Sequence, residues 1–220
     1  MSANTSPAVT GFRWIVFALA FGYWCYEFTV FSRELFGWQF RFLTIWGLTA
    51  NAIVAFLMLR YSLGRSERTY NPLVTATVIL GAIVVFMYWK LYLTDPALVN
   101  SGSEVVWYQE YYLHGLGPAL MIFDALFILG VFRRIAASIA IMITIFVGYI
   151  FWIELLVGPR NTYPEGSVTA GMPYPFLNDM ELAQRINFYG VTIGTAIVFF
   201  IVGLLLSRAI ARLQGRAVTA

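Results

Sequence analysis

Four ionisable side chains lie inside long apolar stretches of the sequence, where their chemistry would be unusual: Glu27, His114, Asp124 and Glu154. A charged group at membrane depth costs at least about 2.5 kcal/mol on insertion scales, so residues of this kind are candidates for function. His114 is the single histidine of the chain, and imidazole is the side chain that exchanges a proton most readily near neutral pH. His114 is therefore the first candidate for a general base. With one histidine and one cysteine, Cys25, the chain has no multi-histidine metal site, iron–sulfur cluster or internal disulfide.

The composition is that of a polytopic membrane protein. Of the 220 residues, 60% are hydrophobic and 11% are charged, whereas a soluble domain has about 25% charged residues. Such a surface could not be solvated, which excludes the soluble globular and the disordered classes. A membrane span needs about 20 apolar residues. We expect six spans, at 13–31, 39–60, 72–94, 111–131, 135–157 and 187–208. The predicted fold class is all-α, with one transmembrane domain of six helices over residues 1–220.

The basic residues indicate how this bundle is oriented, because cytoplasmic loops carry an excess of arginine and lysine. If six helices alternate, one side receives Arg13, Arg60, Arg65, Arg68, Arg133, Arg134, Arg208, Arg212 and Arg216. The other side receives only Arg33, Arg41, Lys90, Arg160 and Arg185. We therefore expect both termini to be cytoplasmic. The segment between the last two spans, rich in Gly and Pro, then lies outside, where a long loop is often a lid or a binding element.

This topology places several polar side chains at one depth, because a helix rises about 1.5 Å per residue. Thr44 is expected roughly 8 Å inside the outer end of its span, and His114 roughly 5 Å inside the outer end of its own. The same outer layer receives Glu27, Arg41, Lys90 and Glu154. Deeper in the bilayer, Asn51 and Asp124 are expected at similar depth, where a hydrogen bond between them would relieve two costly groups. A protonated Asp124 that pairs with a backbone carbonyl would also serve.

The sequence around His114 predicts a kink. Pro118 has no N–H for the carbonyl of His114, four residues earlier, and Gly115 and Gly117 remove side chains from the same turn. The result should be a free carbonyl and open space beside the imidazole. A kink that only lets helices pack closely is an equally good explanation.

Five short segments carry a resemblance to a known family: 38–44 with Asn51 and Ala52, 86–92, His114 with Pro118 and Asp124, 147–152, and 174–177. In this order, over most of the chain, they resemble the androgen-induced and androgen-dependent TFPI-regulating proteins. These are multi-pass membrane hydrolases of fatty acid esters of hydroxy fatty acids. The resemblance implies a threonine nucleophile and a histidine, which fall on Thr44 and His114.

The hypothesis that follows is an integral-membrane lipid ester hydrolase without cofactor or metal. Thr44 would attack an ester carbonyl while His114 takes its proton, because a hydroxyl needs a base to become a nucleophile. A third, orienting group could be Glu154, Glu27 or a backbone carbonyl, and the oxyanion donor could be Arg41 or Lys90. The residues expected to bind the lipid substrate are Arg41, Lys90, Asn51 and Glu154.

Other readings of the same residues remain open. The chain could be a non-catalytic membrane subunit or a lipid-binding scaffold, in which Thr44→Ala would change no activity. Glu27, His114 and Glu154 could in principle hold iron or manganese. A transporter is disfavoured because no internal repeat is evident, and the dispersed arginines do not form a nucleic-acid site. The sequence identifies no protein partner. Arginine-rich, lysine-poor usage is typical of bacteria and favours a bacterial inner membrane.

Overall fold

The structure is a computed structural model that describes residues 3–30, 33–99 and 106–215, and its long elements are helices. Residue 31, at the end of the first expected span, and Arg216, one of the expected inner arginines, lie outside the described residues. In the described part, six helical stretches are long and apolar enough to cross a membrane: Pro7–Val30, Leu43–Ser62, Asn71–Thr94, Trp107–Leu129, Ile135–Arg160 and Leu182–Leu213. The prediction of an all-helical, multi-pass integral membrane protein is therefore confirmed.

Four of these stretches are single α-helices, and two contain wider turns. The single helices are α1 (Pro7–Val30), α2 (Leu43–Ser62), α3 (Asn71–Thr94) and α8 (Leu182–Leu213). The fourth stretch consists of α4 (Trp107–Tyr111), the π-helical η4 (Tyr112–Leu116), α5 (Gly117–Phe123) and the π-helical η5 (Asp124–Leu129). The fifth consists of α6 (Ile135–Trp152), the π-helical η6 (Ile153–Val157) and the 3₁₀ turn η7 (Gly158–Arg160). The short elements are η1 (Ala3–Thr5), η2 (Trp38–Arg41), η3 (Pro96–Leu98) and α7 (Pro175–Asn178).

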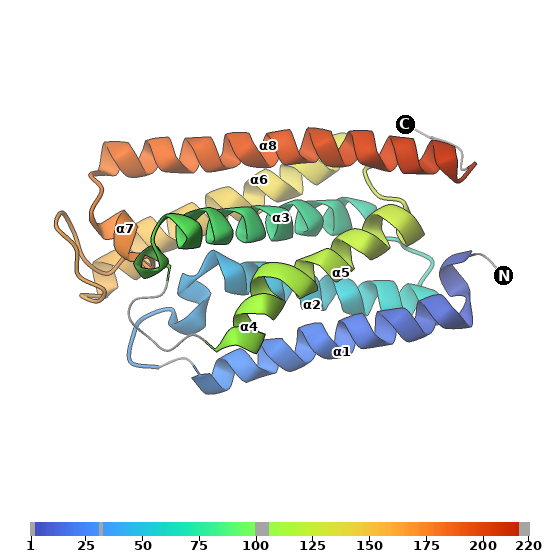
Figure 1. The fold of residues 1–220 in the computed structure, drawn as a ribbon, viewed down its shortest axis with the longest axis horizontal. Coiled ribbons are helices and arrows are strands. Elements are labelled where there is room, and N and C mark those ends of the chain that lie inside the picture. The colour runs from blue at the N-terminus through green and yellow to red at the C-terminus, as the bar shows by residue number, and fades with distance from the viewer. Residues whose placement is uncertain (1–2, 31–32, 100–105, 216–220) are drawn as a thin grey trace.

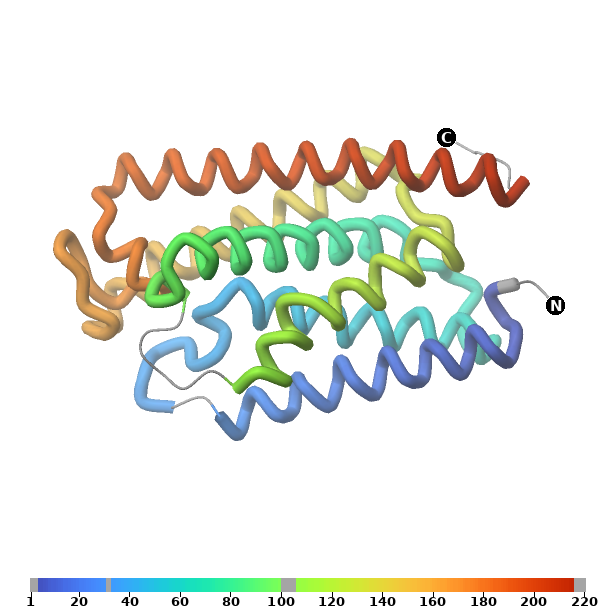
Figure 2. Tube along the Cα trace, viewed as in Figure 1, coloured from blue at the N-terminus to red at the C-terminus, as the bar shows by residue number. Residues whose placement is uncertain are grey.

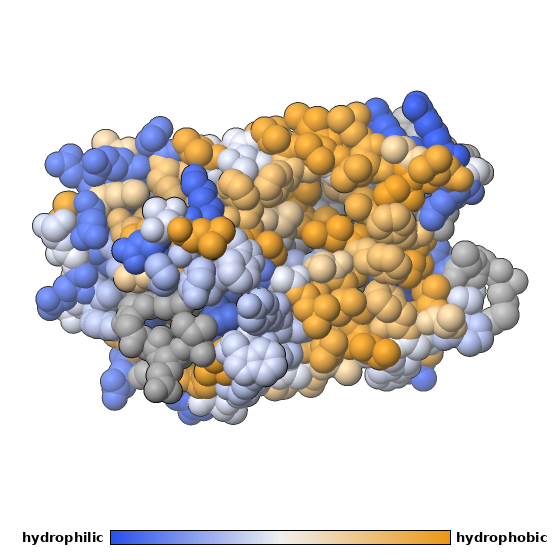
Figure 3. Space-filling view, in the orientation of Figure 1, coloured by the Kyte–Doolittle hydropathy of each residue, from blue (hydrophilic) through white to orange (hydrophobic). Residues whose placement is uncertain are grey.

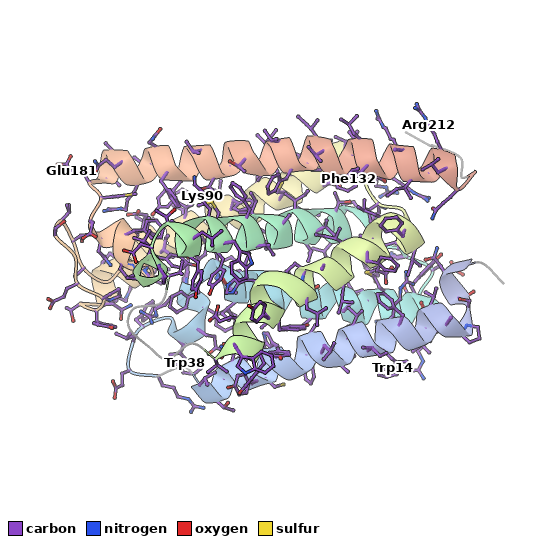
Figure 4. All side chains as sticks on the ribbon, in the orientation of Figure 1. Trp14, Trp38, Lys90, Phe132, Glu181 and Arg212 are labelled. Atoms are coloured by element: carbon purple, nitrogen blue, oxygen red, sulfur yellow. The ribbon has the colours of Figure 1, made fainter. Side chains whose placement is uncertain are left out.

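Both termini lie at one end of the bundle (Figure 1). We call the opposite end, which carries η2, η3, η7 and α7, the distal end (Figures 1 and 2). Trp38, Lys90 and Glu181 lie toward the distal end, and Trp14, Phe132 and Arg212 lie toward the termini (Figure 4). On the face shown in Figure 3, apolar residues cover the middle, and hydrophilic residues gather at the distal end and at the margin beside the termini. This pattern fits a bundle that spans a bilayer; the cytoplasmic position of the termini stays a prediction.

The second span begins four residues later than expected. Gly37, with a φ of +88°, opens the 3₁₀ turn η2, and Phe42 is extended, so that α2 starts only at Leu43. The carbonyl of Phe40 accepts hydrogen bonds of 2.9 Å from the indole N–H groups of both Trp46 and Trp152, which holds the turn on the bundle. Thr44 is therefore the second residue of a helix rather than a residue in its second turn.

The expected Asn51–Asp124 hydrogen bond is wrong, because Asp124 is paired with an arginine. Nε and Nη2 of Arg13, on α1, each donate to a carboxylate oxygen of Asp124 at 2.7 Å. Nη1 of Arg13 donates to the Ser62 hydroxyl at 2.7 Å. Arg13 and Asp124 are each 1% exposed. Arg13 is among the residues predicted on the cytoplasmic side, and its long side chain turns into the bundle and joins three spans.

The loop between the last two spans, residues 161–181, closes the distal end. Asn161 is bonded to Phe36 in both directions: its side-chain oxygen accepts from the Phe36 N–H at 2.8 Å, and its amide nitrogen donates to the Phe36 carbonyl at 3.1 Å. Asn178 is bonded to the backbone of Met172 in the same way: its side-chain oxygen accepts from the Met172 N–H, and its amide nitrogen donates to the Met172 carbonyl. Phe176 and Leu177 pack in one apolar cluster with α6 residues. The loop therefore packs over the distal end of the bundle.

Candidate active site

His114 lies in the π-helical turn η4, whose backbone departs from regular helix. Its φ of −110° and ψ of 23° mark the kink that Pro118 predicts. Gly117 is needed here, because a Cβ at that position would lie 3.0 Å from the Tyr112 carbonyl oxygen. The carbonyl of His114, expected to be free, accepts a 2.7 Å hydrogen bond from the Trp89 indole. The kink therefore frees the His114 carbonyl, and the Trp89 indole holds His114 in place through that carbonyl.

Thr44 and His114 meet across two spans. The Thr44 Oγ1 atom lies 3.3 Å from Nε2 of His114. The imidazole is 6% exposed and stacks on the Tyr88 ring, with the centroids 3.6 Å apart and the planes 6° from parallel. A hydroxyl and an imidazole nitrogen at this separation are within the loose range of a nucleophile and its base before substrate binds.

Glu110 is a functional candidate that the sequence analysis missed. Its Oε2 atom lies 2.9 Å from Nδ1 of His114, the ring nitrogen that faces away from Thr44, although the two atoms are not aligned for a hydrogen bond. The sequence alone suggests Glu154, Glu27 or a backbone carbonyl as the orienting group. The signal was present, because Glu110 precedes His114 by four residues and side chains at that spacing are neighbours on a helix. Thr44, His114 and Glu110 thus form one row of hydroxyl, imidazole and carboxylate.

A cavity of about 630 Å³, which we call the central pocket, opens beside this row. Thr44, Glu110 and His114 line it, together with apolar side chains from several spans. The apolar part lies between α3, α6 and α8 and includes Met87, Leu91, Phe146, Ile150, Phe188 and Ile193. Pockets of 300 to 1,000 Å³ with mostly apolar walls and a few polar groups are typical of small-molecule sites. The central pocket has the size and lining for an acyl chain.

Arg41 and Glu27 also line the central pocket. Arg41 is 7% exposed, and its Nε donates to the Trp38 carbonyl at 3.1 Å, whereas Nη1 has no hydrogen-bond partner among the described residues. Burial lowers the pKa of Arg41 from its ordinary value. Both carboxylate oxygens of Glu27 accept from the Gln109 amide, at 3.0 and 3.2 Å. Arg41 thus brings a cation with an unused donor to the pocket, and Glu27 brings a carboxyl group that is already hydrogen-bonded.

Three residues expected to bind substrate lie elsewhere. Glu154 accepts from Arg185 at 2.8 and 3.2 Å and from the Tyr189 hydroxyl at 2.6 Å, and it does not line the central pocket. Lys90 is exposed and is also absent from the pocket lining. Asn51 lines a separate cavity of about 20 Å³ beside Thr44. Helix rise per residue predicts the depth of these residues in the bilayer, but it does not predict which side of the helix each side chain occupies.

The described residues contain no group of three or more His, Cys, Asp or Glu side chains that could hold a metal ion. Glu27 and Glu154, the carboxylates of the metal-site alternative, have the separate partners described above.

Comparison with known protein families gives one match that covers most of the chain. A family model described as FAR-17a/AIG1-like protein matches residues 12–208. No curated protein and no solved structure matches the chain. The matched region contains all six spans except the ends of the first and the last.

Proposed function

Because the chain belongs to the FAR-17a/AIG1-like family, we propose that it is an integral-membrane hydrolase of fatty-acyl esters, with Thr44 as nucleophile and His114 as base. The observation that carries the proposal is the 3.3 Å approach of Thr44 Oγ1 to His114 Nε2 at the wall of a 630 Å³, mostly apolar pocket. The family that the sequence resembles implies the same two residues.

The reaction proceeds in two halves. Thr44 Oγ1 bonds to the carbonyl carbon of the ester while its proton passes to Nε2 of His114, and the carbonyl electron pair moves to oxygen. When the carbonyl re-forms, the bond to the alcohol breaks and His114 returns the proton to the leaving oxygen. Water then attacks the acyl-threonine in the same way and releases the fatty acid and Thr44. Glu110, beside Nδ1, keeps the proton on that nitrogen and stabilises the imidazolium that forms.

The substrate proposed is an ester with an apolar acyl chain and a carboxylate on the alcohol part, as in esters of hydroxy fatty acids. The apolar walls between α3, α6 and α8 suit the acyl chain. The guanidinium of Arg41, with its unused Nη1, suits the carboxylate, because arginine binds carboxylates through paired N–H donors. Arg41 is three residues before Thr44, so the carboxylate would be held at the distal end of the pocket.

The test is labelling with a fluorophosphonate probe, which reacts with activated hydroxyl groups. We expect labelling of the wild type and of Thr44→Ser, and none of Thr44→Ala. His114→Ala should be labelled much more slowly. A matched control is Thr195→Ala, because Thr195 does not line the central pocket and its hydroxyl donates to the Val191 carbonyl of its own helix.

Labelling that persists in Thr44→Ala would refute the nucleophile. If no form is labelled and no ester in a chain-length series is hydrolysed, the non-catalytic scaffold becomes the better account.

A further inference from the structure

Tyr174, the residue before α7, is held tightly at the wall of the central pocket. Its ring packs edge-on against Phe42, with the centroids 5.5 Å apart, and stacks on Phe176 at 5.7 Å. Pro175 starts α7 directly after it. The loop 161–181 thus delivers one phenol to the place where α2 begins.

The oxygen of Tyr174 is bonded at the N-terminus of α2. It accepts a hydrogen bond of 3.2 Å from the N–H of Leu43, the first residue of that helix. The first N–H groups of a helix have no carbonyl partner within it and carry the positive end of the helix dipole. The Tyr174 hydroxyl also interacts with the side chains of Thr44 and Tyr149. It therefore lies next to the nucleophile, on the electropositive end of the helix that carries it.

The hydrogen of the Tyr174 hydroxyl takes no part in the bond to Leu43, because there the Tyr174 oxygen is the acceptor. Leu43 donates to the Tyr174 oxygen, and the neighbouring Tyr149 hydroxyl gives its own hydrogen to the Arg41 carbonyl at 2.9 Å. Burial raises the pKa of Tyr174, so the phenol keeps its proton at neutral pH. The Tyr174 O–H faces the side chains of Thr44 and Tyr149, and it can turn from them to an atom in the pocket beside Thr44.

We propose that the Tyr174 hydroxyl is an oxyanion donor of the proposed ester hydrolysis. This inference rests on the proposed function. As Thr44 Oγ1 bonds to the carbonyl carbon, the carbonyl oxygen becomes negative and accepts a hydrogen bond from Tyr174, with no proton transferred. The bond weakens again when the carbonyl re-forms. Tyrosine hydroxyls and backbone N–H groups at helix N-termini are both known types of oxyanion donor. Of the donors expected from the sequence, Lys90 does not line the pocket, and Arg41 is proposed above to hold the carboxylate of the substrate.

The experiment compares two ligands on wild type and Tyr174→Phe. The first is a long-chain trifluoromethyl ketone, whose adduct with a hydroxyl nucleophile carries an oxyanion. The second is the corresponding alcohol, which has the same chain but forms no adduct. We expect Tyr174→Phe to weaken the ketone about 100-fold and to lower kcat by a similar factor, because one oxyanion donor contributes about 10²–10³ to kcat. The alcohol should bind both forms within about twofold.

The control variant is Tyr23→Phe, whose hydroxyl donates to the Tyr108 carbonyl and which does not line the central pocket. It should leave both ligands unchanged. An equal loss of ketone and alcohol in Tyr174→Phe would overturn the inference, because it would assign Tyr174 a role in shaping the pocket. Unchanged ketone binding would overturn it as well.

The same comparison separates this inference from the proposed function. If wild type does not prefer the ketone to the alcohol, or if Thr44→Ala keeps that preference, the nucleophile is wrong, and the oxyanion role fails with it. If the preference depends on Thr44 but not on Tyr174, only the present inference fails. Should Tyr174→Phe not fold, 3-fluorotyrosine at position 174 keeps the hydroxyl and makes it a stronger donor. The ketone must then bind more tightly relative to the alcohol, and an unchanged ratio contradicts the inference.

Discussion

Glu110→Gln is the substitution that best probes the row of Thr44, His114 and Glu110. The change keeps the size of the side chain but removes the negative charge 2.9 Å from Nδ1 of His114. In the proposed reaction that charge faces an imidazolium only while Thr44 attacks the ester and while water attacks the acyl-threonine. The loss should therefore lower kcat more than it raises KM.

The magnitude follows from the distance. Two unit charges 2.9 Å apart interact by about 6 kcal/mol at an effective dielectric constant of about 20. The Glu110 side chain is 21% exposed, and glutamine still offers a carbonyl oxygen, so we take about half of this value as the net effect. About 3 kcal/mol corresponds to roughly 100-fold in rate, since each 1.36 kcal/mol is a factor of ten.

The assay is release of fatty acid from a long-chain ester by the purified protein in detergent. Glu110→Gln should retain about 1% of the wild-type kcat. Glu165→Gln serves as the control, because Glu165 is an exposed carboxylate of the loop that does not line the pocket. If Glu110→Gln keeps more than half of the wild-type kcat, the orienting role of Glu110 is refuted.

Three further predictions concern the substrate, the kink and the buried ion pair. Arg41→Gln should raise KM about tenfold for an ester of a hydroxy fatty acid but not for its methyl ester, since only the free acid carries the charge that arginine binds; equal effects on both would contradict the proposed binding. Gly117→Ala should slow hydrolysis at least tenfold without unfolding the protein, because the added Cβ meets the Tyr112 carbonyl at 3.0 Å and shifts the turn that holds His114; full activity would show that the turn adapts. Asp124→Asn should lower the free energy of unfolding by about 3 kcal/mol, because it leaves Arg13 buried without its counter-ion. The double variant Asp124→Asn with Arg13→Met should be more stable than the sum of the two single changes predicts. Thermal melts in detergent measure this, and strict additivity would argue against the pair.

The sequence predicts the architecture well, because hydropathy and the need to satisfy backbone groups within the bilayer determine where helices cross. All six spans overlap the observed stretches. At the start of α2 the helix begins four residues later than expected, because Gly37 and the two indoles that bind the Phe40 carbonyl form a 3₁₀ turn instead of helix. The bond from Trp152 to the Phe40 carbonyl joins segments far apart in the chain, and the local sequence pattern does not predict such a contact.

The partners of individual polar groups were harder to predict than their depth. Rise per residue gives a level in the bilayer, and that level brought Thr44 and His114 to the same layer. It does not give the rotation of each helix, which turns Glu154 toward Arg185. It also ignores the reach of a long side chain, which carries the Arg13 guanidinium from α1 to Asp124.

The most direct measurement of the central claim is capture of the acyl-enzyme. Wild type is mixed with a long-chain p-nitrophenyl ester, quenched in acid within the first turnovers, digested and mapped by mass spectrometry. The account predicts the acyl mass on the peptide that contains Thr44, at no more than one acyl group per chain, and its absence in Thr44→Ala. Steady release of p-nitrophenol by wild type with no acyl group on Thr44, or with the acyl group on another residue, would contradict it.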